Sequence, residues 1–203
     1  MKIEYICLGN GGRSPMADSI GKDFVKTIDA DVEISSSGVV HHPMFEAAKS
    51  DTEALEGFVE TAYGNGLFGK SSHLARLALS IVNRDYSPED LETCVKYILH
   101  AEDTFRNVAL LEVGIMPQGP YHQPTAPRDV DLILTMTAGN TESVKKIYDG
   151  SGFTPVITEV NVYAGIEGDV ANAFCKLLPA YREARDGLMK AVPASIARAL
   201  DEL

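Results

Sequence analysis

A cysteine and an arginine near the N-terminus have the types and the spacing needed for chemistry on a phosphate group. Cys7 follows a short apolar run, and Arg13 comes six residues later. A loop between a strand and a helix can turn its backbone N–H groups inward, and these groups bind an anion together with the helix N-terminus. The guanidinium of Arg13 can hold two phosphate oxygens at once. The same positive field favours the thiolate form of Cys7, so the pattern predicts a nucleophilic cysteine facing a bound phosphate.

The residues between Cys7 and Arg13 are predicted to form the phosphate-binding loop. Glycine at three of these five positions permits unusual backbone angles and leaves room for the anion. Ser14 can donate a hydrogen bond to the thiolate, and its type and position also suit the N-cap of the helix that follows. A cysteine and an arginine at this spacing also occur by chance, as a buried thiol and a surface cation. The predicted substrate-binding residues are Leu8, Gly9, Asn10, Gly11, Gly12 and Ser14.

The pattern of apolar residues predicts an α/β fold around this loop. Strand-like runs alternate with segments of helical periodicity at both ends of the chain, which is the order expected of a parallel sheet covered by helices. The second strand is predicted to be short and to end in a turn at residues 35–38, where three serines precede a glycine. The predicted strands are 2–8, 32–34, 130–136 and 155–160, and the predicted helices are 15–28, 139–149 and 179–203.

Residues 43–128 are predicted to form a mainly helical insertion within a single domain of residues 1–203. A helical pattern covers residues 73–83, and Ser87 is predicted to start another helix. The glycines within 64–69 indicate a turn between helical pieces. The insertion begins after the second strand, near the end of the sheet where the phosphate loop is expected, so it is a candidate source of substrate specificity.

The composition limits the classes of partner. The chain has 203 residues, with 18 Lys and Arg against 29 Asp and Glu, and a formal net charge of −11. Such a surface repels nucleic acid and anionic membranes, so neither is expected as a partner. No run approaches the ~20 apolar residues of a membrane span, and the N-terminus lacks the pattern of a signal peptide.

The cysteines and histidines do not form a recognisable metal-binding pattern. Three cysteines are too few and too widely spaced for a disulfide framework or a clustered metal site, so no metal or other cofactor is expected. A cytoplasmic location is expected, because a reducing compartment keeps a nucleophilic thiol usable. Four histidines are either contributors to substrate specificity or plain surface and capping residues, namely His41, His42, His73 and His122.

The run from Cys7 to Ala17, Cys-Leu-Gly-Asn-x-x-Arg-Ser-Pro-Met-Ala, resembles a known family signature. It is similar to the N-terminal signature of the low-molecular-weight protein tyrosine phosphatases and of the related arsenate reductases and protein-arginine phosphatases. Three further segments fit the same pattern: Ser37-Gly38, Asp131 to Met136 with Asn140, and Tyr163 to Asp169. The resemblance covers roughly residues 1–42 and 129–203, and it implies a four-stranded parallel sheet flanked by helices.

The resemblance implies roles for four residues of the loop. In that family the cysteine attacks phosphorus to form a phosphocysteine, and the arginine stabilises the equatorial oxygens of the transferring group. These roles fall to Cys7 and Arg13. The asparagine that holds the loop corresponds to Asn10, and the serine that partners the thiolate corresponds to Ser14. The implied activity is hydrolysis of a phosphorylated protein or a small phosphate ester, with phosphotyrosine favoured and phosphoarginine as the other candidate.

The chain departs from the family where the general acid is expected. The family carries aspartate and proline followed by an aromatic residue, but Asn172 and Ala173 precede Phe174 here. An amide cannot protonate a leaving group, and general acid catalysis contributes about 10²–10⁴-fold in rate. Asp169 is the predicted substitute and Glu167 the next candidate, although both residue types are also common as plain surface carboxylates.

Gly12 is the second departure, because many family members carry a second cysteine at this position. Together with Gly11 it leaves the rim of the pocket without side chains, so specificity must come from elsewhere. Two alternative functions therefore stay open. One is a phosphate-binding or phosphoprotein-binding module with weak turnover. The other is an arsenate reductase that relays through Cys94 or Cys175, which are otherwise small buried residues.

Overall fold

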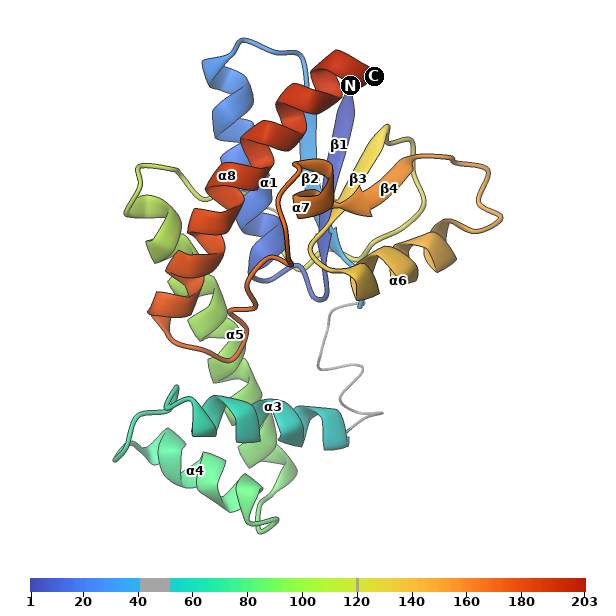
Figure 1. The fold of residues 1–203 in the computed structure, drawn as a ribbon. Helices are drawn as coiled ribbons and strands as arrows, with labels where there is room; N and C mark the ends of the chain where they lie inside the picture. The colour runs from blue at the N-terminus through green and yellow to red at the C-terminus, as the bar shows by residue number, and fades with distance from the viewer. Residues whose placement is uncertain (41–51, 120) are drawn as a thin grey trace.

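One parallel sheet of four strands organises the molecule (Figure 1). The computed structural model describes residues 1–40, 52–119 and 121–203. The strands are β1 (Lys2–Cys7), β2 (Glu33–Gly38), β3 (Leu132–Thr135) and β4 (Val156–Glu159). They lie in the order β2–β1–β3–β4, and each neighbouring pair is parallel. The predicted α/β fold with a four-stranded parallel sheet is therefore confirmed.

Helices cover both faces of this sheet, because alternate residues of its central strands point to opposite sides. On one face, Ile3 and Tyr5 belong to a buried cluster with side chains of α1 and α8. On the other face, Ile6 and Ile133 cluster with Val144 of α6. All five side chains are fully buried, so β1 is held from both sides up to its carboxyl end. The helices beside the sheet are α1 (Arg13–Thr27), α6 (Ala138–Tyr148), α7 (Val160–Tyr163) and α8 (Leu178–Glu202).

β2 is longer than the sequence pattern predicted. It runs to Gly38, which pairs with the last residue of β1, so the predicted turn at 35–38 is wrong. The serines tolerate the strand because their hydroxyls find partners in the tertiary structure. Ser36 Oγ accepts from Asn10 at 3.0 Å, and Ser37 Oγ donates to a buried carboxylate at 2.6 Å.

Within residues 52–119, three helices pack on one another. They are α3 (Thr52–Gly64), α4 (His73–Val82) and α5 (Pro88–Leu111), and apolar side chains from all three form a second buried cluster. The predicted helix at 73–83 is confirmed, and so is the predicted start at Ser87, which forms a capping box with Asp90. α5 extends from this bundle to the sheet-bearing part of the molecule, where it packs against α8 (Figure 1).

Part of the segment predicted as an insertion is not described. Residues 43–51 and 120 lie outside the described residues, as do His41 and His42. The division into a single domain of residues 1–203 with an insertion at 43–128 stays a prediction.

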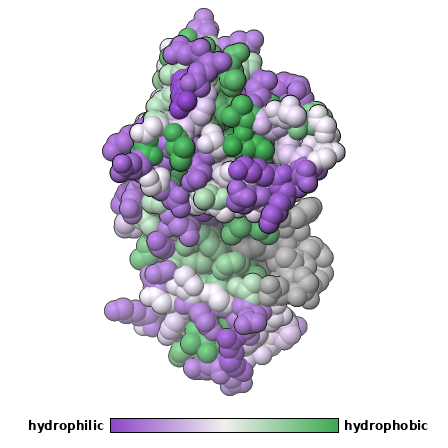
Figure 2. Space-filling view, turned by 45° about the vertical axis from the view of Figure 1, so that its right-hand side comes forward, coloured by the Kyte–Doolittle hydropathy of each residue, from purple (hydrophilic) through white to green (hydrophobic). Residues whose placement is uncertain are grey.

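The surface carries both polar and apolar areas. Figure 2 shows apolar side chains at the level where the three-helix bundle meets the sheet-bearing part, and further apolar areas among the hydrophilic ones above that level. None of the helices that the structure describes combines the length and the hydropathy needed to cross a membrane. Within residues 1–40, 52–119 and 121–203, no three His, Cys, Asp or Glu side chains form a group suited to hold a metal ion.

Candidate active site

The predicted phosphate loop lies at the carboxyl end of β1, between that strand and α1. Cys7 is the last residue of β1, and its side chain is buried. Ser14 Oγ lies 3.0 Å from Cys7 Sγ and 3.1 Å from the carbonyl oxygen of Ser37, so its hydroxyl can donate to either. α1 begins at Arg13 with Gly12 at the N-cap and no side-chain cap, so the predicted N-cap role of Ser14 is wrong. The hydroxyl lies within hydrogen-bond distance of the thiol instead.

Asn10 holds the loop in its shape. Its φ of 52° lies in the left-handed region, which asparagine adopts more readily than most residues. The buried side chain donates to Ser14 Oγ at 3.1 Å and to Ser36 Oγ at 3.0 Å. Its Oδ1 accepts from the backbone of Gln123 at 2.9 Å, and its carbonyl oxygen accepts from the backbone of His122 at 3.0 Å. These contacts tie the loop to α1, to β2 and to the segment before β3.

β2 approaches the loop so closely that only glycine fits at its end. A Cβ atom at Gly38 would lie 2.7 Å from the nitrogen of Asn10 and 2.9 Å from the carbonyl oxygen of Leu8. Both are backbone atoms, so neither can turn aside. Gly38 also accepts from Thr125 and donates to the carbonyl of Gln123, each at 2.8 Å. Its missing side chain therefore allows three segments of backbone to pack around the loop.

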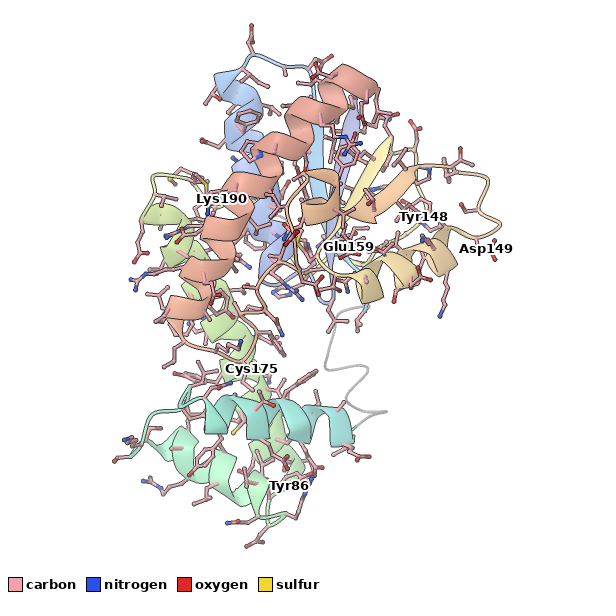
Figure 3. All side chains as sticks on the ribbon, viewed as in Figure 1. Tyr86, Tyr148, Asp149, Glu159, Cys175 and Lys190 are labelled. Carbon is pink, nitrogen blue, oxygen red and sulfur yellow. The ribbon has the colours of Figure 1, made fainter. Side chains whose placement is uncertain are left out.

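Arg13, at the far end of the loop, contacts the segment between α7 and α8. Its Nη1 donates to the carbonyl oxygen of Val170 at 3.2 Å, and the exposed Asp169 is the preceding residue. Burial and a hydrogen bond with Asp169 raise the pKa of Glu159, which ends β4 and is labelled in Figure 3. This pair of carboxyl groups lies one residue away from the group that Arg13 contacts.

α5 brings a second set of charged side chains to the loop. Arg106 is fully buried, donates to the carbonyl oxygen of Gly11, and pairs with Asp103 at 2.7 Å. Its guanidinium also lies 3.6 Å from the ring centroid of Tyr121. Asp103 lies 3.3 Å from Nε2 of His122, and this hydrogen bond raises the pKa of the imidazole. The side of the loop that faces α5 is therefore lined with ionisable groups.

Glu102, from the same helix, lies directly against the loop. A Cβ atom at Gly11 would collide with Glu102 Oε2, and one at Gly12 would lie 2.8 Å from Glu102 Oε1. The carboxyl group thus occupies the space that side chains at these two positions would need. Only 8% of the residue is exposed, and burial raises its pKa to about 7 despite the attraction of nearby cationic side chains.

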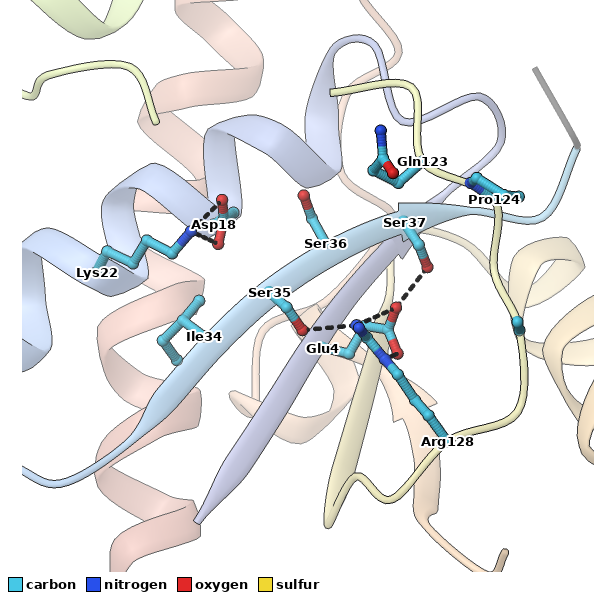
Figure 4. A pocket seen from close by; sticks show the side chains of 11 residues that line it. Glu4, Asp18, Lys22, Ile34, Ser35, Ser36, Ser37, Gln123, Pro124 and Arg128 are labelled. Atoms are coloured by element: carbon cyan, nitrogen blue, oxygen red, sulfur yellow. Dashed lines mark hydrogen bonds and ion pairs between the residues drawn. The ribbon is translucent and has the colours of Figure 1, made fainter. Parts of the chain in front are cut away.

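A pocket beside β2 contains the residues that support the loop from this side (Figure 4). The buried Glu4 carboxylate accepts from Ser37 Oγ at 2.6 Å and pairs with Arg128 at 2.7 Å. Ser36 and Gln123, which both bind the loop asparagine, also line this pocket. The pocket therefore contains residues that bind the loop asparagine and a Glu4 carboxylate that is already paired.

Other residues considered in the sequence lie in different surroundings. His73 begins α4 and is exposed, whereas His122 binds the loop through its backbone. Cys94 and Cys175 are buried in the cluster of the three-helix bundle, and Figure 3 labels Cys175 where the bundle meets the rest of the molecule. Burial raises the pKa of Cys94 to about 11 and that of Cys175 to about 12, so these thiols stay protonated at neutral pH.

Known proteins match both the sequence at the start of the chain and the fold. The sequence model of the low molecular weight phosphotyrosine protein phosphatase family matches residues 2–63. A YwlE mutant from Bacillus subtilis has 20% sequence identity and a TM-score of 0.62, with 100% of this chain and 99% of that one covered. A YwlE arginine phosphatase C7S mutant with a phosphorylated active-site serine has 19% identity, coverage of 100% and 97%, and a TM-score of 0.60. A low-molecular-weight phosphotyrosine phosphatase from Vibrio cholerae O395 has 14% identity, coverage of 100% and 97%, and a TM-score of 0.62. No curated protein sequence matches the chain.

The chain has the fold of the low-molecular-weight phosphotyrosine phosphatases. The predicted resemblance to this family is therefore confirmed. Within this phosphatase fold, Asn172 is exposed and has a local contact, because its Oδ1 accepts from the backbone of Phe174 at 3.3 Å. The amide stabilises its own turn, and it cannot supply a proton.

Sequence reasoning missed the charged side chains that this phosphatase fold brings from α5 to the loop. The apolar residues Leu91, Val95 and Ile98 form one buried stripe of the helix. The next position on that stripe is Glu102, four residues after Ile98, and Arg106 follows after one more turn. Two charged residues that continue an apolar stripe are the signal that could have found them, because buried charges in proteins have partners or functions.

Proposed function

We propose that this chain is a cysteine-dependent phosphatase that hydrolyses phosphorylated protein through a phosphocysteine intermediate. The observation that carries the proposal is the Cys7 thiol beside the Ser14 hydroxyl, at the start of a loop that ends at Arg13 and the N-terminus of α1. The similar YwlE arginine phosphatase mutant, whose active-site serine is phosphorylated, supports a covalent route for this fold.

The reaction proceeds in two steps. First, the Cys7 thiolate attacks phosphorus, an S–P bond forms, and the bond between phosphorus and the leaving group breaks while Asp169 gives the leaving group a proton. Water then attacks phosphorus and loses a proton to Asp169, the S–P bond breaks, and inorganic phosphate leaves the regenerated thiolate. In both steps the loop amides and Arg13 stabilise the charge on the equatorial oxygens.

Asp169 is the general acid in this proposal, because Asn172 cannot be. Its support is the interaction with Glu159, which raises the pKa of that carboxyl group, and its position next to Val170, which Arg13 contacts. Glu167 lies two residues earlier and is exposed.

Replacing Asp169 by asparagine is expected to slow the hydrolysis of an ester with a poor leaving group by about 10²-fold or more. An aryl phosphate with a strongly electron-withdrawing ring should lose much less, because its leaving group departs without a proton. The measurement is kcat/KM for both esters, which reports the step in which the leaving group departs, with Asp149→Asn at the exposed end of α6 as the matched control. An equal loss for both esters would argue against a role in proton donation.

Trapping the intermediate tests the proposed function directly. When the protein is quenched during turnover of a phosphate ester, mass spectrometry should find a phosphoryl group on the peptide that contains Cys7. Iodoacetate at mildly acidic pH should alkylate Cys7 and leave Cys94 unmodified, and inorganic phosphate should slow this alkylation. Turnover without a phosphoryl group on Cys7 would contradict the mechanism. Tight phosphate binding without turnover or trapping would favour the phosphate-binding module instead.

Two substrate classes suit the proposed reaction. Phosphotyrosine is favoured by the sequence resemblance, and phosphoarginine is supported by the similarity to an arginine phosphatase. A phosphorylated protein or a small phosphate ester is thus the proposed partner, in the cytoplasm. Arsenate reduction receives less support, because it needs a second reactive thiol and burial keeps Cys94 and Cys175 protonated.

A further inference from the structure

The two glycines of the loop and the carboxyl group of Glu102 form one structural unit. Gly11 and Gly12 have no side chains, and the Glu102 carboxyl group fills the space beside their Cα atoms. Arg106, one turn further along α5, also binds this part of the loop, because its guanidinium donates a hydrogen bond to the carbonyl oxygen of Gly11. The side chain that shapes this part of the pocket therefore comes from α5 and not from the loop itself.

The loop amides do not bind the Glu102 carboxyl group. None of the hydrogen bonds among the described residues runs from a loop amide to Glu102. The residue keeps 8% of its surface exposed. Its carboxyl group therefore lies beside the loop, and no amide of the loop is committed to it.

Several charged groups face this carboxyl group, and they determine how it ionises. Three basic side chains face it: His122, Arg106 and, from α1, Arg13. Each of them favours the carboxylate form of Glu102. Asp103, next to it on α5, opposes ionisation. From α8 and the preceding loop it faces the Tyr181 and Cys175 side chains. Burial first and Glu102 second raise the pKa of each of these groups, so both are neutral at physiological pH.

We propose that Glu102 determines the substrate class by contacting the leaving group and selecting one that carries positive charge and N–H donors. The inference rests on the proposed function, and of its two substrate classes it favours phosphoarginine. The guanidinium of phosphoarginine offers N–H groups and a positive charge to the carboxylate, which forms charge-assisted hydrogen bonds. The ring of phosphotyrosine offers neither, and it would place an apolar surface against the buried carboxylate.

The experiment compares one peptide in two forms, with phosphoarginine or phosphotyrosine at the same position. Glu102→Gln is expected to lower kcat/KM for the phosphoarginine peptide by roughly 10- to 100-fold, because a charged hydrogen bond is lost. The value for the phosphotyrosine peptide should stay the same or rise. Glu102→Asp should retain part of the preference, and Glu92→Gln, on the exposed face of the same helix, should leave both values unchanged.

The pH dependence supplies a second readout. Glu102 is neutral below its pKa of about 7 and ionised above it. The preference of the wild type for phosphoarginine should therefore rise as the pH increases from one unit below this value to one unit above it. In Glu102→Gln the preference should not change with pH in this way.

Two outcomes would overturn the proposal. An equal loss for both peptides in Glu102→Gln would indicate a structural role, and an unchanged preference would exclude contact with the leaving group. If the wild type formed no phosphocysteine with either peptide, the proposed function would fall as well. The two failures can be told apart. If the protein hydrolyses the peptides but Glu102→Gln keeps the wild-type preference between them, only the assignment of Glu102 is overturned.

Discussion

Replacing Cys7 by serine is expected to lower the rate of phosphate ester hydrolysis by at least about 10³-fold, because the nucleophile of the first step is lost. The serine hydroxyl holds its proton near neutral pH, whereas the thiol of a cysteine can ionise there. Cys7 lies at the end of a strand with Ser14 beside it, and that geometry does not depend on sulfur. Phosphate binding, which comes from the loop amides and Arg13, should therefore persist.

Steady-state turnover and isothermal titration with inorganic phosphate measure the two parts of this prediction. The variant should bind phosphate but turn over very slowly, and any serine that becomes phosphorylated should accumulate. Cys94→Ser is the matched control, because it changes a buried thiol of the three-helix bundle and leaves the loop intact. If Cys7→Ser kept the wild-type rate, the proposed nucleophile would be wrong.

The second large effect is expected for Arg13, where lysine should lower kcat by roughly 10²–10³-fold. Arginine offers two parallel N–H donors to two phosphate oxygens, and a lysine ammonium offers only a point charge on a flexible stem. Lysine would also lose the contact with the carbonyl oxygen of Val170, which fixes the guanidinium at 3.2 Å. The charge is kept, so phosphate affinity should fall much less than the rate.

Kinetics and phosphate titration on the same preparation separate these effects. Arg182→Lys is the control, because that residue is a partly exposed arginine on α8 that pairs with Glu112. A loss of affinity as large as the loss in kcat would mean that Arg13 serves the ground state and the transition state equally.

The sequence predicted the fold where local signals agree. β1, α1 and the loop between them combine an apolar run, glycines and a helical stripe, and the capping box at Ser87 marks the start of α5. The prediction from sequence was wrong for the end of β2, because three serines in a row are typical of a turn. Here the serines continue a strand because they have tertiary partners such as Asn10 and Glu4.

The sequence also predicted some residues of the candidate site and missed others. Cys7, Asn10 and Arg13 follow one another along the chain, so their shared loop could be inferred from the residue types, their spacing and their position between a strand and a helix. Glu102 could not be assigned to that loop, because its place depends on how α5 packs against the sheet-bearing part. The function of Ser14 was ambiguous for another reason: the same hydroxyl suits an N-cap and a thiol, and the packing of β2 decides between them.

The fit between Glu102 and the two glycines has a consequence for protein engineering. A phosphate loop with larger side chains at positions 11 and 12 would displace the Glu102 carboxyl group, because its first added carbon atoms would meet that group. The loop and α5 are therefore best exchanged together, although the two are far apart in the sequence. A chimera that moves only one of them would carry either a displaced carboxyl group or a void beside the loop.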